Sequence, residues 1–300
     1  MLMGSSPLLM ARTRTGPASS VYRVTLADGR RVVVKLFAES CAHTAEGEAR
    51  MLRAVAVSGR TAVPEVLAAG RVPGFAGTAL ISQDVGDVTL GGLVRAGSIT
   101  PERALRRLGT LLAAFHAIPA PTGARMAPGV IEQAGAVVSR CPDGLASRIA
   151  PALEAIAERC GDRGGFVWCH GDLHWDNVIP AAEGREYLTG RRLPGLLSER
   201  LVDFEGSTLC APEYDVAQTL VTCDAFTPTA RTRLTAAYWR PLDARLLDAF
   251  TVFQAVRGWT FAAQVEQRDR EKWAARLHHA LTDFPHQVRP STPGPEGARP

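Results

Sequence analysis

An eight-residue polar segment that follows one short apolar stretch and precedes another is the feature of this 300-residue chain that most restricts its fold. The segment runs from His170 to Asn177. Phe166–Cys169 before it and Val178–Ile179 after it have the composition of short buried strands. Leu201–Val202 is a similar stretch, and we expect it to pair with Val178–Ile179. The sequence therefore predicts a polar loop held at one place by buried strands.

The spacing of polar groups within this loop indicates a particular chemistry. Asp172 lies two residues after His170 and five before Asn177, which is the H-x-D-x-x-x-x-N spacing of kinase catalytic loops. Asp172 is expected to accept or orient the proton of a substrate hydroxyl, and Asn177 to bind Mg²⁺ through its amide oxygen. Asp203, at the end of the stretch Leu201–Val202, supplies a second oxygen ligand for Mg²⁺. A polar surface turn is the alternative, and Asp203 argues against it.

Lys35 ends the apolar run Val32–Val34 and is one of only two lysines in the chain. A lysine on a buried strand is costly unless anionic groups pair with it. Nucleotide phosphates and a helix carboxylate would do so, as in the V-A-I-K motif. Glu46 and Glu48 are both candidates for the carboxylate. We favour Glu48, because helical spacing places it on the apolar face and Glu46 among arginines.

The turn Gly16–Ser20 comes just before the first expected strand. Its backbone amides and the hydroxyls of Ser19 and Ser20 are placed to contact a β-phosphate, and an ordinary turn is the alternative. The chain contains no G-x-x-x-x-G-K-[ST] sequence, which disfavours a P-loop enzyme.

The histidines of the loop are spaced HxxxH, which invites comparison with zinc sites. A zincin needs H-E-x-x-H on a helix, and Gly171 would weaken a helix here. We therefore place His170 and His174 with Asp172 in the catalytic group, His170 supporting the loop and His174 positioning the loop or a phosphate. His116 is expected to be a hydrogen-bonded core histidine.

The expected elements change character along the chain, which predicts an α+β fold with two lobes. Strands are expected over 21–26, 31–37 and 78–83, and helices over 44–57, 102–118, 144–160 and beyond 213. We assign a β-rich nucleotide-binding lobe to residues 1–88 and a helical catalytic and substrate-binding lobe to 89–288. Residues 289–300 are expected to be a disordered tail. The nucleotide is expected in the cleft between the lobes.

Composition excludes several classes of function. Apolar residues make up 46% and charged residues 21% of the chain, which is typical of a soluble globular protein. The net charge of +4 is small and the arginines are scattered, so no nucleic-acid partner is expected. No apolar stretch reaches the roughly 18 residues of a membrane helix, and we expect no membrane partner. Six cysteines without paired spacing indicate reduced thiols and a cytoplasmic location.

The His170–Gly171–Asp172 sequence, with Asn177 and Asp203, resembles the aminoglycoside phosphotransferase and choline kinase-like group of the protein-kinase-like fold. The resemblance covers about residues 16–222. Three further segments are similar to the V-P-x-V-L, L-x-x-L-H and Y-D-L-A segments of that group, namely Val63–Leu67, Leu112–His116 and Tyr214–Ala217.

This resemblance implies a two-lobed enzyme that uses ATP or GTP with Mg²⁺. It implies that a hinge at Gln83, Asp84 and Val85 reads the purine through its backbone, and that Asp215 buttresses the catalytic loop. The chain departs from the pattern in two places: Phe204 stands where many relatives have tryptophan, and the excursion over 181–200 is longer than expected.

A small-molecule acceptor is favoured over a protein. Ala211–Glu213 spells the A-P-E of protein kinases, but only seven residues separate Asp203 from Ala211. That distance leaves no room for an activation loop with a phosphosite. Gly171 also replaces the arginine of H-R-D.

The acceptor is expected to be hydroxylated and less charged than a typical aminoglycoside, because arginines interleave the acidic residues of the helical half. An antibiotic of nucleoside, macrolide or aminoglycoside-like type is favoured, which would make the protein a resistance or self-protection kinase. A choline-, homoserine- or sugar-like metabolite is the alternative acceptor. AMP transfer and a non-catalytic pseudokinase are weaker alternatives, the latter because Lys35, Asp172, Asn177 and Asp203 are all present. We expect a monomer or homodimer.

Overall fold

The chain divides into two compact units, Met1–Ala127 with Gly164–Pro241, and Pro128–Arg163 with Leu242–Pro300. The computed structural model describes residues 6–15, 19–120, 127–161, 165–180, 199–264 and 269–283. The expected tail and nearly all of the 181–200 excursion lie outside these ranges. The lobe division after residue 88 stays a prediction.

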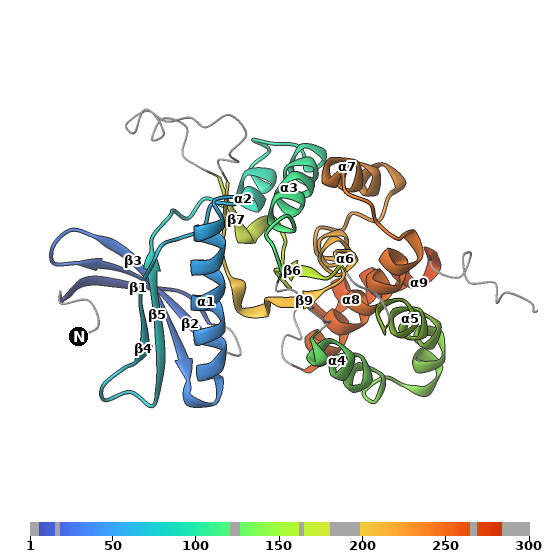
Figure 1. The fold of residues 1–300 in the computed structure, drawn as a ribbon, viewed down its shortest axis with the longest axis horizontal. Helices are drawn as coiled ribbons and strands as arrows, with labels where there is room; N and C mark the ends of the chain where they lie inside the picture. The colour runs from blue at the N-terminus through green and yellow to red at the C-terminus, as the bar shows by residue number, and fades with distance from the viewer. Residues whose placement is uncertain are drawn as a thin grey trace, which may run out of the picture. The chain divides into compact units, whose positions relative to one another are not determined.

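A five-stranded antiparallel sheet forms the first part of the first unit, in the order β1-β2-β3-β5-β4 (Figure 1). Its strands are β1 (Pro7–Thr15), β2 (Ser19–Leu26), β3 (Arg31–Ala38), β4 (Val66–Arg71) and β5 (Gly77–Gln83). The strands expected over 21–26, 31–37 and 78–83 are confirmed. β1 was not predicted.

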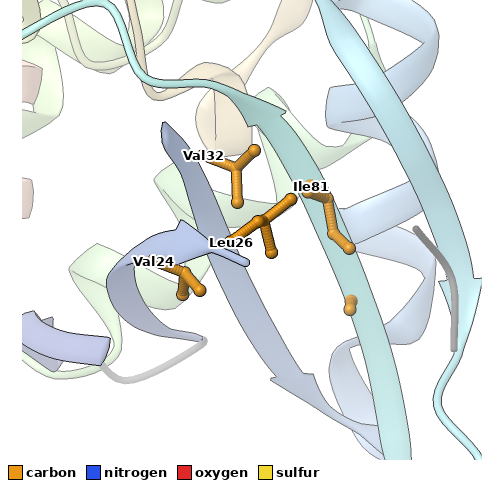
Figure 2. Close-up of a cluster of buried hydrophobic side chains, with 5 residues drawn as sticks. Val24, Leu26, Val32 and Ile81 are labelled. Carbon is orange, nitrogen blue, oxygen red and sulfur yellow. The ribbon is translucent and has the colours of Figure 1, made fainter. Parts of the chain in front are cut away.

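The two faces of this sheet carry different residues, because successive side chains of a strand point to opposite sides. Figure 2 shows Val24, Leu26, Val32 and Ile81, which form an apolar cluster on one face. Helix α1 (Ala42–Ser58) contacts β3, β4 and β5 (Figure 1).

The rest of the first unit is built from helices and two short strand pairs. Its helices are α2 (Leu90–Arg95), α3 (Pro101–Phe115), α6 (Glu213–Thr222) and α7 (Pro228–Tyr238). β6 (Val167–Cys169) pairs with β9 (Thr208–Cys210), and β7 (Val178–Ile179) pairs with β8 (Arg200–Leu201). The expected strand pair beside the polar loop is therefore present, one residue earlier on its second strand than predicted.

Helix α3 begins where the sequence indicates and ends earlier. The side chain of Thr100 accepts a hydrogen bond from the Arg103 amide, and Pro101 occupies the first turn, a position where its missing N–H costs nothing. The helix ends at Phe115 rather than at Ile118. His116 is its C-cap and is buried, as expected for a core histidine.

The second unit is helical in its described part. It contains α4 (Pro128–Val138), α5 (Asp143–Gly161), α8 (Ala244–Gln264) and α9 (Arg270–Asp283). Gly258 lets α8 and α9 approach closely, because a Cβ there would lie 2.0 Å from the Trp273 ring. Among the described helices, none is long and apolar enough to cross a bilayer.

Candidate active site

The polar loop after β6 is anchored by one buried carboxylate. Asp215, on the first turn of α6, is fully buried and accepts the backbone N–H of His170 at 2.6 Å and that of Gly171 at 2.8 Å. His116 Nε2 lies 3.0 Å from the same carboxylate. Burial by itself would raise the pKa of Asp215, but the hydrogen bonds from His116 and the loop outweigh it and lower the pKa. Asp215 therefore holds the start of the loop as an anion.

Gly171 is required at its position by both conformation and space. Its φ is +80°, a value that disfavours residues with a side chain. A Cβ added there would lie 1.9 Å from the carbonyl oxygen of Gly206. The loop therefore approaches the segment after Asp203 at backbone contact distance. This explains why glycine stands where protein kinases have the arginine of H-R-D.

His170 supports the loop from inside and is fully buried. Its Nε2 lies 3.0 Å from the Val202 carbonyl and its Nδ1 accepts the Asp172 amide at 3.4 Å. Burial lowers the pKa of His170 against the pull of Asp215, so the neutral ring donates from Nε2. The ring packs against Phe204, with centroids 4.5 Å apart. This placement agrees with support of the loop rather than contact with a substrate.

Asp172 lies at the surface end of the loop, with 39% of its side chain exposed. Gln218 Nε2 donates to its Oδ1 at 3.2 Å, and Asn177 Nδ2 donates to its backbone oxygen at 2.8 Å. His174 Nε2 is 3.8 Å from its Oδ2. Because the Asn177 nitrogen is engaged with Asp172, the amide oxygen is the atom that remains for a cation.

Lys35 lies at the centre of three carboxylates. Its Nζ is 2.7 Å from Glu48 Oε1, 2.7 Å from Asp203 Oδ1 and 3.3 Å from Glu205 Oε1. The predicted pairing with Glu48 is confirmed, and Glu46 is exposed.

One ammonium cannot neutralise three carboxylates in a buried site. Burial opposes the charge of Lys35, but Asp203, Glu48 and Glu205 outweigh it and raise the pKa of Lys35. Burial also raises the pKa of Glu48 to about 7, because Lys35 compensates only in part and Asp203 and Glu205 add repulsion. The cluster thus has an excess of negative charge, which a divalent cation would offset.

Asp203 enters this cluster from a strained backbone. Its φ is +70°, a left-handed conformation that is uncommon for a residue other than glycine. The buried Phe204 side chain and the hydrogen bond from the Phe204 amide to Glu48 follow directly in the chain. Such strain persists where the surrounding structure imposes it, which is common at functional sites.

A cavity of about 460 Å³ opens beside this cluster. Alternate residues of the sheet line it, on the face opposite the apolar cluster of Figure 2. The sheet residues that line it are Thr13, Val21, Arg23, Val33, Lys35, Leu80, Ser82 and Gln83. Asn177, Ile179 and Asp203 line it from the loop side. The candidate metal ligands and the lysine therefore share one cavity.

The expected hinge residues lie along this cavity. Gln83 and Val85 line it, whereas the Asp84 side chain turns to two arginines of the sheet. Its carboxylate is 3.3 Å from Arg23 and 2.8 Å from Arg31. Burial would raise the pKa of Asp84, and the hydrogen bond from Arg31 together with the Gly86 amide lowers it. The Asp84 side chain thus braces the segment expected to be the hinge.

Comparison with protein-family profiles identifies the family of this chain. The profile of the phosphotransferase enzyme family matches residues 11–247. The chain belongs to the phosphotransferase enzyme family. No curated protein sequence matches this phosphotransferase significantly.

Solved structures confirm the fold of the phosphotransferase as protein-kinase-like. It is similar to the GDP complex of aminoglycoside 2′-phosphotransferase-IIIa, with a TM-score of 0.64 and 15% identity over 93% of this chain and 94% of that one. For amicoumacin kinase hAmiN with AMP-PNP, Ca²⁺ and Ami the TM-score is 0.66 and the identity 13%, over 94% and 90%. For macrolide 2′-phosphotransferase type I the values are 0.59 and 20%, over 94% and 92%.

Ser19 and Ser20 were expected in a turn before the first strand, and they lie instead at the start of β2. Residues 16–18 lie outside the described part of the phosphotransferase. The Ser19 hydroxyl donates to Glu205 at 2.6 Å, and the Ser20 hydroxyl accepts from Arg12 at 3.5 Å. The phosphate-binding role of both serines stays a prediction.

Glu205 is the site residue that the sequence interpretation missed. Its carboxylate gathers with those of Glu48 and Asp203, so that one oxygen of each lies within 4.8 Å of the others. The available signal was its position two residues after Asp203, at the end of a Phe-Glu pair where many relatives have Trp-Glu. The role of an acid there became visible only through its contacts with Lys35 and Ser19.

Proposed function

We propose that this phosphotransferase moves the γ-phosphate of ATP or GTP to a hydroxyl group of a small molecule. The observation that carries the proposal is the juxtaposition of Lys35, Glu48 and Asp203 in the cavity that Asn177 also lines. Lysine and oxygen ligands in one cavity are what a nucleoside triphosphate and its metal require. The GDP and AMP-PNP complexes of two similar proteins support a nucleotide donor.

The donor set fits a magnesium ion. Asn177 offers an amide oxygen and Asp203 a carboxylate, and the Val202 amide donates to the Asn177 carbonyl at 3.1 Å, which keeps the two segments adjacent. Glu205 adds a carboxylate to the negatively charged cluster. Mg²⁺ favours hard oxygen ligands together with substrate phosphates. When bound, it would neutralise charge on the transferring phosphate.

The other site residues bind the phosphates, orient the acceptor and support the loop. Lys35, oriented by Glu48, holds the phosphates. Asp172 orients the acceptor hydroxyl and accepts its proton, as expected of a carboxylate that is partly exposed and braced by Gln218. His170 and Asp215 keep the loop in place without contacting the substrate.

The acceptor that we propose is a hydroxylated antibiotic less charged than a typical aminoglycoside. The small net charge of +4 supplies no attraction for polycations. Similar structures carry the names of aminoglycoside, amicoumacin and macrolide kinases, so the fold accommodates different acceptors. A metabolite alcohol is the alternative acceptor.

An assay of ADP release over a panel of hydroxyl compounds tests the function. We expect Asp172→Ala to lower turnover at least about 100-fold, as for a lost general base. Asp28→Ala is the matched control, because its side chain is also 39% exposed and lies in the β2–β3 turn. Mass spectrometry of the product distinguishes phosphate transfer from AMP transfer, because the two groups add different masses to the acceptor. Nucleotide consumption that Asp172→Ala leaves unchanged would refute the proposal.

A further inference from the structure

Asp176 directly precedes Asn177, and the proposed transfer assigns no role to its carboxylate. The structure gives this carboxylate three hydrogen bonds from two residues, Thr89 and Arg95. Its Oδ1 lies 2.8 Å from the Thr89 hydroxyl and 2.7 Å from one Arg95 nitrogen, and its Oδ2 lies 3.0 Å from the other. Two parallel bonds between guanidinium and carboxylate fix orientation as well as distance. The hydrogen bond from Arg95, foremost, and that from Thr89 lower the pKa of Asp176 against its partial burial.

Thr89 ties this carboxylate to the start of α2. Its hydroxyl accepts the Gly92 amide at 2.9 Å, which caps the helix, and donates to Asp176. A hydroxyl has one proton and two lone pairs, so both contacts are made at once. Thr89 therefore fixes the position of the first turn of α2 relative to the Asp176 carboxylate.

Backbone packing brings α2 against the loop at the same place as the ion pair. A Cβ at Gly91 would lie 2.3 Å from Asp176 Oδ1 and 2.9 Å from Trp175 Cδ1. The α2 backbone thus packs directly against the side chains of Asp176 and Trp175 at Gly91. Thr89 and Asp176 also line the cavity.

Asn177 follows Asp176 directly and is tied to the same loop by hydrogen bonds. The Asp176 amide donates to His174 Nδ1 at 3.2 Å, and the Asn177 amide to the His174 carbonyl at 3.0 Å. The Asn177 side chain donates to Asp172. Residues 175–177 form a single 3₁₀ turn, so displacement of Asp176 moves Asn177 with it.

We propose that Asp176 is a positioning residue that clamps the catalytic loop to α2 through Thr89 and Arg95 and so holds the Asn177 amide oxygen at the metal site. The inference rests on the proposed function. Arg95 is 64% and Asp176 37% exposed, and exposed ion pairs contribute little to stability. Loss of the clamp therefore changes metal-dependent binding much more than it changes the unfolding temperature.

Binding of AMP-PNP by calorimetry, with Mg²⁺ and without metal, tests the clamp before any acceptor is known. We expect Asp176→Ala to weaken AMP-PNP binding in Mg²⁺ about 10-fold, as when a group that orients a metal ligand is lost. Binding without metal should stay unchanged. Arg95→Ala should act in the same direction, and the double variant should be no weaker than Asp176→Ala, because both remove one interaction.

Electron paramagnetic resonance of Mn²⁺ with AMP-PNP adds a readout that a merely structural residue would not move. The Mn²⁺ spectrum should change in Asp176→Ala and stay as in the wild type in Glu39→Ala. Glu39 is the matched control, because it forms another exposed ion pair, with Arg71, in the same unit and does not line the cavity.

The outcomes separate this inference from the proposed function. Equal weakening with and without metal would make Asp176 a direct nucleotide contact and overturn the clamp, as would unchanged binding in Asp176→Ala. If that variant does not fold, Asp176→Asn and Arg95→Ala give the same decision. A wild type that binds neither AMP-PNP nor GMP-PNP together with Mg²⁺ would overturn the proposed function and the clamp together.

Discussion

Asparagine in place of Asp215 changes the shape of a buried side chain very little and its hydrogen bonding a great deal. Oδ2 of Asp215 accepts from the His170 amide and lies 3.0 Å from His116 Nε2, while Oδ1 accepts from the Gly171 amide. The asparagine oxygen can replace one carboxylate oxygen. The asparagine NH₂ group, itself a donor, must then face a backbone or histidine N–H, and that N–H loses its acceptor.

The magnitude follows from these contacts. One buried N–H left without an acceptor costs about 1–3 kcal/mol. The two remaining hydrogen bonds lose their charge assistance, at about 1 kcal/mol each. We therefore expect Asp215→Asn to lower the free energy of unfolding by about 3–5 kcal/mol, the range found when a buried charged pair is broken. For a unit of this size that corresponds to a melting temperature about 6–20 °C lower.

Urea unfolding followed by circular dichroism measures this change, with Asp87→Asn as the matched control. Asp87 has a 78% exposed side chain that is paired with Arg23, so the same substitution there should cost no more than about 1 kcal/mol. A loss in Asp215→Asn below about 1 kcal/mol, the worth of one ordinary hydrogen bond, would refute the reasoning.

Two further predictions concern Gly171 and the buried carboxylates. Gly171→Ala should melt well below the wild type and lose activity, because its φ is +80° and Gly206 leaves no space for a Cβ; a variant with wild-type melting temperature and ADP release would contradict this. Asp215 and Asp84 have lowered pKa values, so the unfolded chain binds more protons and stability should fall as the pH drops below about 4. Urea midpoints from pH 7 to pH 3 measure this, and the decline should be shallower in Asp215→Asn; parallel declines would contradict the assignment to Asp215.

Local patterns predicted much of the fold. Alternation predicted the strand over 21–26, and the turn after it predicted the strand over 31–37 as its partner. Each strand has one face in the apolar cluster (Figure 2). Helical spacing also selected Glu48 over Glu46, since α1 packs against the sheet with one face. The edge strand β1 escaped prediction because Leu8, Leu9 and Met10 are all exposed there, which leaves no alternation of buried and exposed positions to detect.

Local patterns could not predict contacts between segments that are distant in the sequence. Asp84 was expected in the hinge, but its pairing with Arg31 joins residues 53 positions apart. The Asp176 contact with Thr89 spans 87 positions. Neither pairing leaves a periodic trace in the sequence, because it depends on how a loop meets a strand or a helix end.

The sequence by itself determined which polar groups the loop brings together. The intervals between His170, Asp172 and Asn177 lie within eight residues, where backbone geometry alone relates the side chains. The tertiary structure decided which groups meet Lys35. It brought Asp203 and Glu205 to that lysine across 168 and 170 positions, because the loop that carries both carboxylates lies against the sheet that carries Lys35.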